Sequence, residues 1–195
     1  MLATRLKNQI LTHRKMSSVD RLSTSLKNRK YSLAEHSYYV ASMFEDFARA
    51  ENLPYTVKDM YFVMRHDYLE AITTDLIYPI KKLSKVTSDC WDTIEAEIIK
   101  QKESEFINLF SDEDLKEALD PLLYRLMKTC DFLDLFLFCL EEAFLGNITV
   151  ELRHIMETLK PIILGSGFET INAFVTDCIL EYREQLEYNT IKEIY

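Results

Sequence analysis

The scarcity of glycine and proline is the feature of this sequence that most restricts its fold. The 195 residues include only three Gly and four Pro. Proteins rich in β-structure need many tight turns, and these turns rely heavily on both residues because of their unusual backbone geometry. A hydrophobic content of 48% is still sufficient for a packed core. The composition therefore predicts an all-α protein, and the length predicts a single domain over residues 1–195.

Hydrophobic periodicity places the helices. Ser32 and Glu35 have the spacing of a capping box, and apolar residues then recur every three or four positions to about Glu51. The residues between 16 and 30 have no clear period, and those between 75 and 85 indicate a basic loop. We find no strand pattern, internal repeat or linker. The other expected helices cover 3–15, 57–64, 88–110, 121 to a stop at Gly146, 152–164 and 168–186.

Charge and cysteine usage exclude several classes of protein. A net charge of −9 argues against a surface that coats a nucleic-acid polymer. The four Cys are widely spaced and form no Cys-x-x-Cys pair, which argues against a structural zinc site and favours a reducing, cytoplasmic compartment. Cys130 and Cys139 lie within apolar runs and are expected to be core thiols. The N-terminus lacks the apolar core of a signal peptide, and no apolar run reaches about 18 residues, so no membrane association is expected.

The run from Met64 to Leu76 concentrates groups that can perform chemistry. His66 and Asp67 are adjacent, and an imidazole beside a carboxylate can bind a divalent metal. Glu70 lies about one helical turn after Asp67 and can face the same point. Metal ligands with a nearby carboxylate are the components of metal-assisted hydrolysis. A His-Asp dipeptide also arises by chance, so this interpretation depends on partners elsewhere in the chain.

Two such partners lie on other predicted helices. His36 falls in the first turns of the helix that begins near Ser32. Asp131 and Asp134 interrupt a strongly apolar helix, where a carboxylate is costly unless it is paired or binds a metal. The order His36, then His66-Asp67, then Asp131 therefore suggests one metal site built from separate helices.

This order resembles the signature of the HD-domain metal-dependent phosphohydrolases. A closer resemblance, over residues 21 to 150, is to the small bacterial 5'-deoxynucleotidases of this superfamily. It rests on Arg21 fifteen residues before His36, on Asp131 followed by Glu141-Glu142 and Gly146-Asn147, and on two local patterns. These patterns are Ala34-Glu35-His36-Ser37 and His66-Asp67-x-x-Glu70-x-x-Thr73-x-Asp75-Leu76-x-x-Pro79-x-Lys81.

The resemblance implies an HD-type helical bundle with one divalent metal, which could be Mn, Co, Zn, Fe or Mg. It also implies roles for individual residues. The implied metal ligands are His36, His66, Asp67 and Asp131. Glu70 would assist the attacking water, Arg21 and Lys81 would hold the phosphate, and Asp75 would contact the deoxyribose. Leu22 stands where the family usually has Trp, near the expected position of the sugar or base.

The implied function is hydrolysis of a deoxynucleotide, and alternatives remain at this stage. A 5'-deoxynucleotidase releases phosphate from a dNMP, whereas a related HD enzyme releases triphosphate from a dNTP. Two basic runs, residues 27–30 and Lys81 to Lys85, could bind a triphosphate if they reach the pocket. A second alternative is an HD hydrolase with two metals, but it would need further His ligands. A third is a non-catalytic nucleotide-binding module, which would not need Glu70. A homo-oligomer, a dimer or larger, is also expected.

Overall fold

The computed structural model describes residues 2–73, 85–106, 109 and 111–192, and all the regular secondary structure within them is helical. The described residues contain no β-strand, only an isolated antiparallel bridge between Asp20 and Ser32. The predicted all-α class is therefore confirmed. The elements are α1 (Leu2–Lys15), the 3₁₀ helix η1 (Met16–Ser18), α2 (Leu33–Ala50), α3 (Val57–Val63), α4 (Glu70–Thr73), α6 (Lys85–Lys102), α7 (Asp112–Ala118), α8 (Pro121–Phe144), α9 (Val150–Leu164) and α10 (Glu169–Lys192).

Local sequence signals determine where the main helices begin. Ser32 caps α2 in a complete capping box with Glu35, as the sequence predicts. Thr56 and Ser111 cap α3 and α7 in the same way. At α8, the Asp120 side chain accepts a hydrogen bond from the Leu122 amide and Pro121 occupies the first turn, where its missing N–H costs nothing.

The helix predicted over 88–110 differs most from the structure, because α6 covers Lys85–Lys102. The helix ends at Lys102, and Arg5 of α1 donates hydrogen bonds to the carbonyl oxygens of Glu103 and Phe106 in the segment that follows. This contact spans nearly 100 residues of sequence, so hydrophobic periodicity could not predict it. The loop expected over 75–85 lies outside the described residues except for Lys85, which begins α6.

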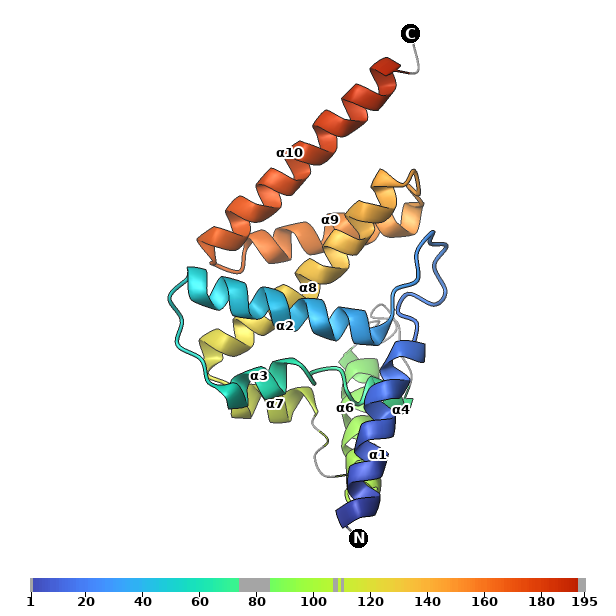
Figure 1. Cartoon of the computed structure of the whole chain (residues 1–195), viewed down its shortest axis with the longest axis vertical. Helices are drawn as coiled ribbons and strands as arrows, with labels where there is room; N and C mark the ends of the chain where they lie inside the picture. Colours follow the sequence, from blue (N-terminus) through green and yellow to red (C-terminus); the bar gives the residue numbers. More distant parts are fainter. Residues whose placement is uncertain (1, 74–84, 107–108, 110, 193–195) are drawn as a thin grey trace.

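The hydrophobic core lies around the crossing of α2 and α8, with α3, α7, α9 and α10 packed on it (Figure 1). Phe44 of α2 and Leu133 of α8 are completely buried there. Cys130 and Cys139 are also fully buried, which confirms the expectation of core thiols. This crossing brings His36 of α2 beside Asp131 and Asp134 of α8, so the core fixes part of the candidate site.

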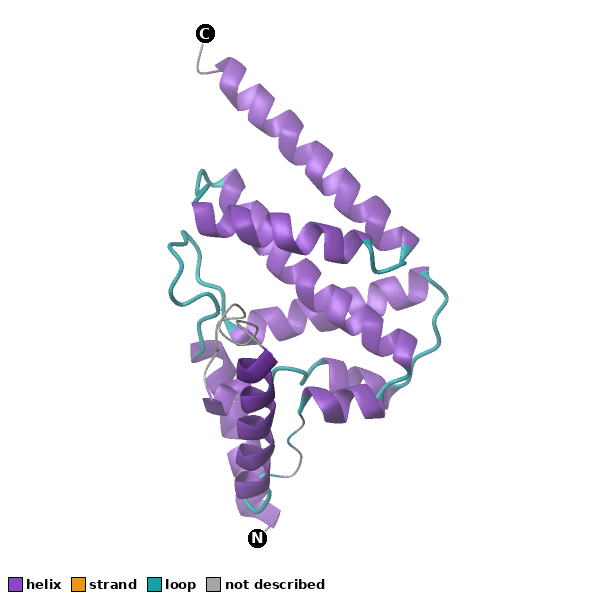
Figure 2. Ribbon diagram, turned by 180° about the vertical axis from the view of Figure 1, so that it is seen from behind, coloured by secondary structure: helices purple, strands orange, loops and turns teal. Residues whose placement is uncertain are grey.

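The loop between η1 and α2 lies beside the end of α8, and α1 and α6 extend to the end of the molecule away from α10 (Figure 1 and Figure 2). None of the helices in the described part of the chain has the length and apolar character needed to cross a membrane.

Candidate metal centre

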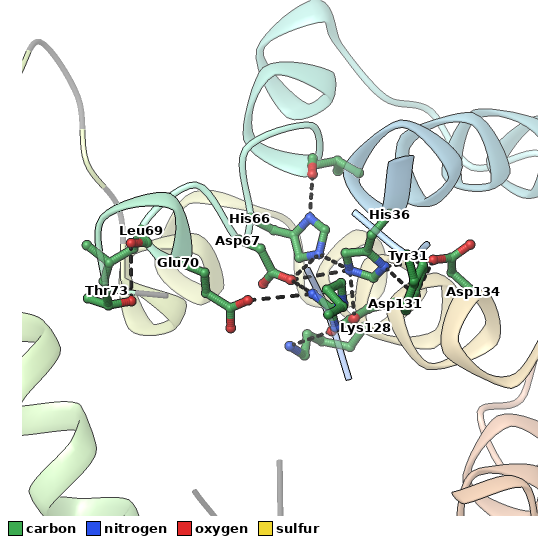
Figure 3. Close-up of polar contacts among 12 residues, drawn as sticks. Tyr31, His36, His66, Asp67, Leu69, Glu70, Thr73, Lys128, Asp131 and Asp134 are labelled. Atoms are coloured by element: carbon green, nitrogen blue, oxygen red, sulfur yellow. Dashed lines mark hydrogen bonds and ion pairs between the residues drawn. The ribbon is translucent and has the colours of Figure 1, made fainter. Parts of the chain in front are cut away.

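Four side chains from three parts of the chain converge on one point (Figure 3). His36 comes from α2, His66 and Asp67 from the turn between α3 and α4, and Asp131 from α8. One ligand atom from each of them lies within 4.8 Å of all the others. The Nε2 atom of His36 is 3.2 Å from His66 Nε2, from Asp67 Oδ2 and from Asp131 Oδ1. These are the four residues that the resemblance implies as ligands.

The turn between α3 and α4 places two adjacent residues in one centre. After α3 ends at Val63, the Arg65 amide bonds to the Phe62 carbonyl and the His66 amide to the Val63 carbonyl. These short-range bonds tighten the chain into a turn. Adjacent residues on a regular helix point about 100° apart, so the turn lets His66 and Asp67 face the same point.

The Nδ1 atoms of both histidines form hydrogen bonds that leave Nε2 free to bind a cation. The Nδ1 atom of His66 lies 2.8 Å from the Val63 carbonyl oxygen, which can only accept, so Nδ1 must carry the proton. His36 Nδ1 lies 2.7 Å from Asp134 Oδ2, a carboxylate oxygen that likewise favours a proton on Nδ1. Both rings can therefore direct the Nε2 lone pair to the centre, as metal-binding histidines do.

Asp134 and Tyr31 support the centre although the predicted site does not include them. The Tyr31 hydroxyl donates a 2.6 Å hydrogen bond to Asp134 Oδ2, the oxygen that also faces His36. Asp134 carries a sequence signal, because it lies one turn after Asp131 in the same apolar helix. Tyr31 carries none, since it follows an irregular segment whose path only the fold reveals.

The buried electrostatics indicate where a proton resides in the metal-free protein. Burial and Arg21 lower the pKa of His36, but hydrogen bonds to three carboxylates outweigh them and raise it to about 10. Burial lowers the pKa of His66. Burial alone would raise the pKa of Asp67, yet His66 and the Arg21 guanidinium hold it well below its ordinary value. One imidazolium among ionised carboxylates thus occupies the position that a cation would take.

Two cationic side chains border the cluster, and Glu70 lies beside one of them. Arg21 NH1 donates to Asp67 Oδ2 at 2.5 Å and lies 3.6 Å from Glu70 Oε2. Lys128 Nζ donates to Asp131 Oδ2 at 3.1 Å. The predicted site omitted Lys128, although its position one helical turn before Asp131 is a signal that could have identified it.

The remaining predicted residues divide into two groups. Asp75 and Lys81 lie outside the described residues. Leu22 is only 9% exposed and belongs to a small hydrophobic cluster with Phe138 and Leu152. It has a positive φ of 51°, which is uncommon for a residue with a side chain.

The basic run 27–30 makes contacts within the protein. Lys27 Nζ is hydrogen-bonded to Asp20 Oδ2 and to two backbone carbonyl oxygens. Arg29 forms a 2.6 Å ion pair with Glu141, and Lys30 Nζ donates to the Ser17 carbonyl oxygen. The structure therefore gives all three cations partners away from the four-residue cluster.

Comparison with known proteins gives a family for this chain and solved structures with a similar fold. Residues 9–182 match the model of a family described as 5'-deoxynucleotidase YfbR-like. A search of curated proteins gave no match. An HD-domain phosphohydrolase from Listeria innocua has a similar fold, with a TM-score of 0.72, 18% identity, and coverage of 91% of this chain and 89% of the other.

Two further solved structures share the fold. The HD phosphohydrolase DatZ of cyanophage S-2L, bound to dA and one catalytic Zn²⁺ ion, gives a TM-score of 0.61 at 18% identity over 91% of this chain and 96% of the other. The PH0347 protein from Pyrococcus horikoshii gives 0.66 at 21% identity over 86% and 96%.

Proposed function

Since this chain belongs to the YfbR-like 5'-deoxynucleotidase family of HD-domain phosphohydrolases, we propose that it hydrolyses deoxynucleoside 5'-monophosphates to deoxynucleosides and phosphate. The observation that carries the proposal is the convergence of four ligand atoms within 4.8 Å, beside Arg21 and Glu70. The match to residues 9–182 supports one catalytic domain over the whole chain. The homo-oligomer and the cytoplasmic location stay predictions.

His36, His66, Asp67 and Asp131 would hold one divalent cation. Two imidazole nitrogens and two carboxylate oxygens suit Mn, Co, Zn, Fe or Mg, with imidazole favouring the transition metals. The cyanophage enzyme with the same fold carries Zn²⁺, which supports a metal at this position. When bound, the cation would supply a Lewis acid for a phosphate oxygen and lower the pKa of a water molecule.

The surrounding side chains would bind the phosphate and move the proton. Arg21 is largely buried beside the centre, with 12% of its side chain exposed, and its guanidinium can donate to two phosphate oxygens at once. Its charge and that of Lys128 would stabilise the negative charge that develops on the phosphoryl group. Glu70 is 8% exposed and is not one of the four candidate ligands, so its carboxylate would be the group that accepts the proton of the attacking water. Lys81 and Asp75 remain predicted substrate contacts.

The contacts of residues 27–30 favour a monophosphate over a triphosphate. A dNTP carries about two more negative charges than a dNMP and needs cations for them. Lys27, Arg29 and Lys30 all contact groups of the protein itself, and the Lys27 side chain is only 9% exposed, so this run offers fewer free cations to a triphosphate. The dA bound by the cyanophage enzyme supports a deoxynucleoside product, which both reactions would release.

The test is hydrolysis of dAMP, dATP and AMP by metal-loaded protein, with product analysis. We expect inorganic phosphate from dAMP, little turnover of the ribonucleotide, and no activity after removal of the metal by a chelator. Release of inorganic triphosphate from dATP, with a kcat/KM well above that for dAMP, would show that the protein is a dNTP triphosphohydrolase instead.

A further inference from the structure

A buried carboxylate far from the metal centre fixes the loop that carries Arg21. Glu142, near the end of α8, is completely buried. Its Oε2 atom accepts hydrogen bonds from the Asn28 amide at 2.6 Å and from Asn147 Nδ2 at 2.7 Å, and its Oε1 atom accepts one from the Arg29 amide at 2.9 Å. Asn147 Nδ2 also donates to the Leu26 carbonyl oxygen at 2.9 Å. The tip of the loop is thereby tied to the end of α8.

Lys27 fixes the same loop from within. Its Nζ atom lies 2.8 Å from Asp20 Oδ2, 2.5 Å from the Arg21 carbonyl oxygen and 3.0 Å from the Leu22 carbonyl oxygen. Only 9% of the Lys27 side chain is exposed. An ammonium group bonded to consecutive carbonyls restricts the backbone directly at Arg21 and at Leu22, whose φ of 51° needs such support.

The base of the loop is joined to the metal centre. The Arg21 amide donates to the Tyr31 carbonyl oxygen at 2.7 Å, and the Tyr31 hydroxyl bonds to Asp134. The loop is therefore held at both ends, at its base by Tyr31 and at its tip by Glu142. The position that the Arg21 guanidinium can reach depends on where its backbone is held, so this loop helps to place it.

We infer that Glu142 and Lys27 are positioning residues for Arg21, which set the loop so that the guanidinium faces the phosphate site. This inference rests on the proposed function, because it takes a phosphate as the group that Arg21 binds. Neither residue touches the four-residue cluster, so each acts through Arg21 and not on the metal.

A double-mutant cycle tests this inference in the metal-loaded protein. Glu142→Gln keeps the shape of the side chain but replaces an acceptor oxygen with a donor that faces a backbone N–H. With Arg21 present, we expect kcat/KM for dAMP to fall at least about tenfold, mainly through KM. In the Arg21→Ala background the same change should cost less than about twofold, because the residue that it positions is gone.

Glu141→Gln is the matched control. It removes the same charge from the adjacent position of α8, but Glu141 is 52% exposed and pairs only with the Arg29 side chain among the contacts described. We expect kinetics close to those of the unmodified protein. Equal losses from Glu142→Gln with and without Arg21, or no loss in either background, would overturn the inference.

A binding measurement separates this inference from the proposed function. Calorimetric titration with inorganic phosphate requires no turnover, so the cycle can be read even if dAMP is not a substrate. Weaker phosphate binding in Glu142→Gln, dependent on Arg21, supports the inference. Phosphate binding that is absent, or unaffected by Glu142→Gln, overturns it. If thermal unfolding shows that Glu142→Gln does not fold, Lys27→Met replaces it in both cycles with the same expected outcomes.

Discussion

Asp131 and Glu142 are carboxylates on the same helix, α8, the first largely and the second completely buried, yet their surroundings are opposite in character. Both oxygens of Glu142 accept hydrogen bonds from neutral N–H groups, two of the backbone and one of Asn147. Asp131 instead faces His36, with Lys128 on its other oxygen and a second carboxylate, Asp67, in the same cluster. About three helical turns separate the two sites.

This difference is the one expected between a structural carboxylate and a predicted metal ligand. Hydrogen bonds from N–H groups offset the free-energy cost of burying the Glu142 carboxylate, so no bound ion is needed. Asp131 shares a small volume with Asp67 and two imidazoles that direct lone pairs inward, so a divalent cation is the group that best balances the charge. The sequence shows the same feature at both positions, an acid within an apolar helix.

The largest effect should separate these two classes of carboxylate. Asp67→Ala removes a predicted ligand, so we expect loss of bound metal and of essentially all hydrolysis. Glu142→Gln should retain stoichiometric metal because its carboxylate does not face the cluster. Elemental analysis after dialysis, with activity measured in parallel, checks both expectations. Metal retained by Asp67→Ala would show that the ligand assignment is wrong.

Glu70→Gln should keep the metal and lose turnover. If Glu70 accepts the proton of the attacking water, an amide of the same shape cannot replace it, and kcat should fall by roughly 10²–10⁴-fold. Metal content and phosphate affinity should remain close to those of the unmodified protein. A loss of metal equal to that of Asp67→Ala would mean that Glu70 is a ligand instead.

The sequence predicted the fold well wherever local signals decide the outcome. The capping box at Ser32 and the apolar period of α2 place that helix within a residue of the expected start. The end of α6 could not be predicted in this way, because it depends on carbonyl groups bound by Arg5 from the far end of the chain. The short helix α4 gave no periodic signal, since it spans only Glu70–Thr73.

For the candidate site, the resemblance indicated which residues belong together, and the structure adds which of them are fixed and by what. His36 and Asp131 fall on predicted helices, so their register followed from periodicity. The contact between Tyr31 and Asp134 did not, because it joins an irregular segment to a helix about 100 residues later. The contacts of Lys27 could not be predicted either. A basic run in a sequence suggests that its side chains face solvent or a ligand, and only the fold shows that Lys27 binds backbone carbonyl groups.

Asp134→Asn should weaken the metal without removing a ligand. The asparagine can still accept a hydrogen bond from His36 Nδ1, but it lacks the charge that stabilises the ring. Loss of such a partner typically costs 10–100-fold in metal affinity. Competition with a fluorescent chelator measures this affinity directly. An unchanged affinity would mean that the Tyr31–Asp134 contact serves only the fold.

Metal affinity should also depend on pH. With a pKa of about 10, His36 is protonated at neutral pH in the metal-free protein, and a cation must displace that proton. Apparent affinity should therefore rise about tenfold per unit of increasing pH between roughly pH 6.5 and 8.5. Titrations corrected for the pH dependence of the chelator test this expectation. A flat profile would mean that His36 is neutral before the metal binds.

The smallest effect is expected at Lys30, and its substitution tests whether the basic run 27–30 binds the substrate. The Lys30 Nζ atom donates to the Ser17 carbonyl oxygen, at an exposed contact in which little free energy is at stake. Lys30→Gln should therefore change kcat/KM by less than about twofold for dAMP and for dATP alike. A selective loss with dATP would instead mean that the run reaches a triphosphate when substrate is bound. In that case a cation of the run leaves its partner in the complex, and the contacts of these residues in the free protein no longer favour a monophosphate.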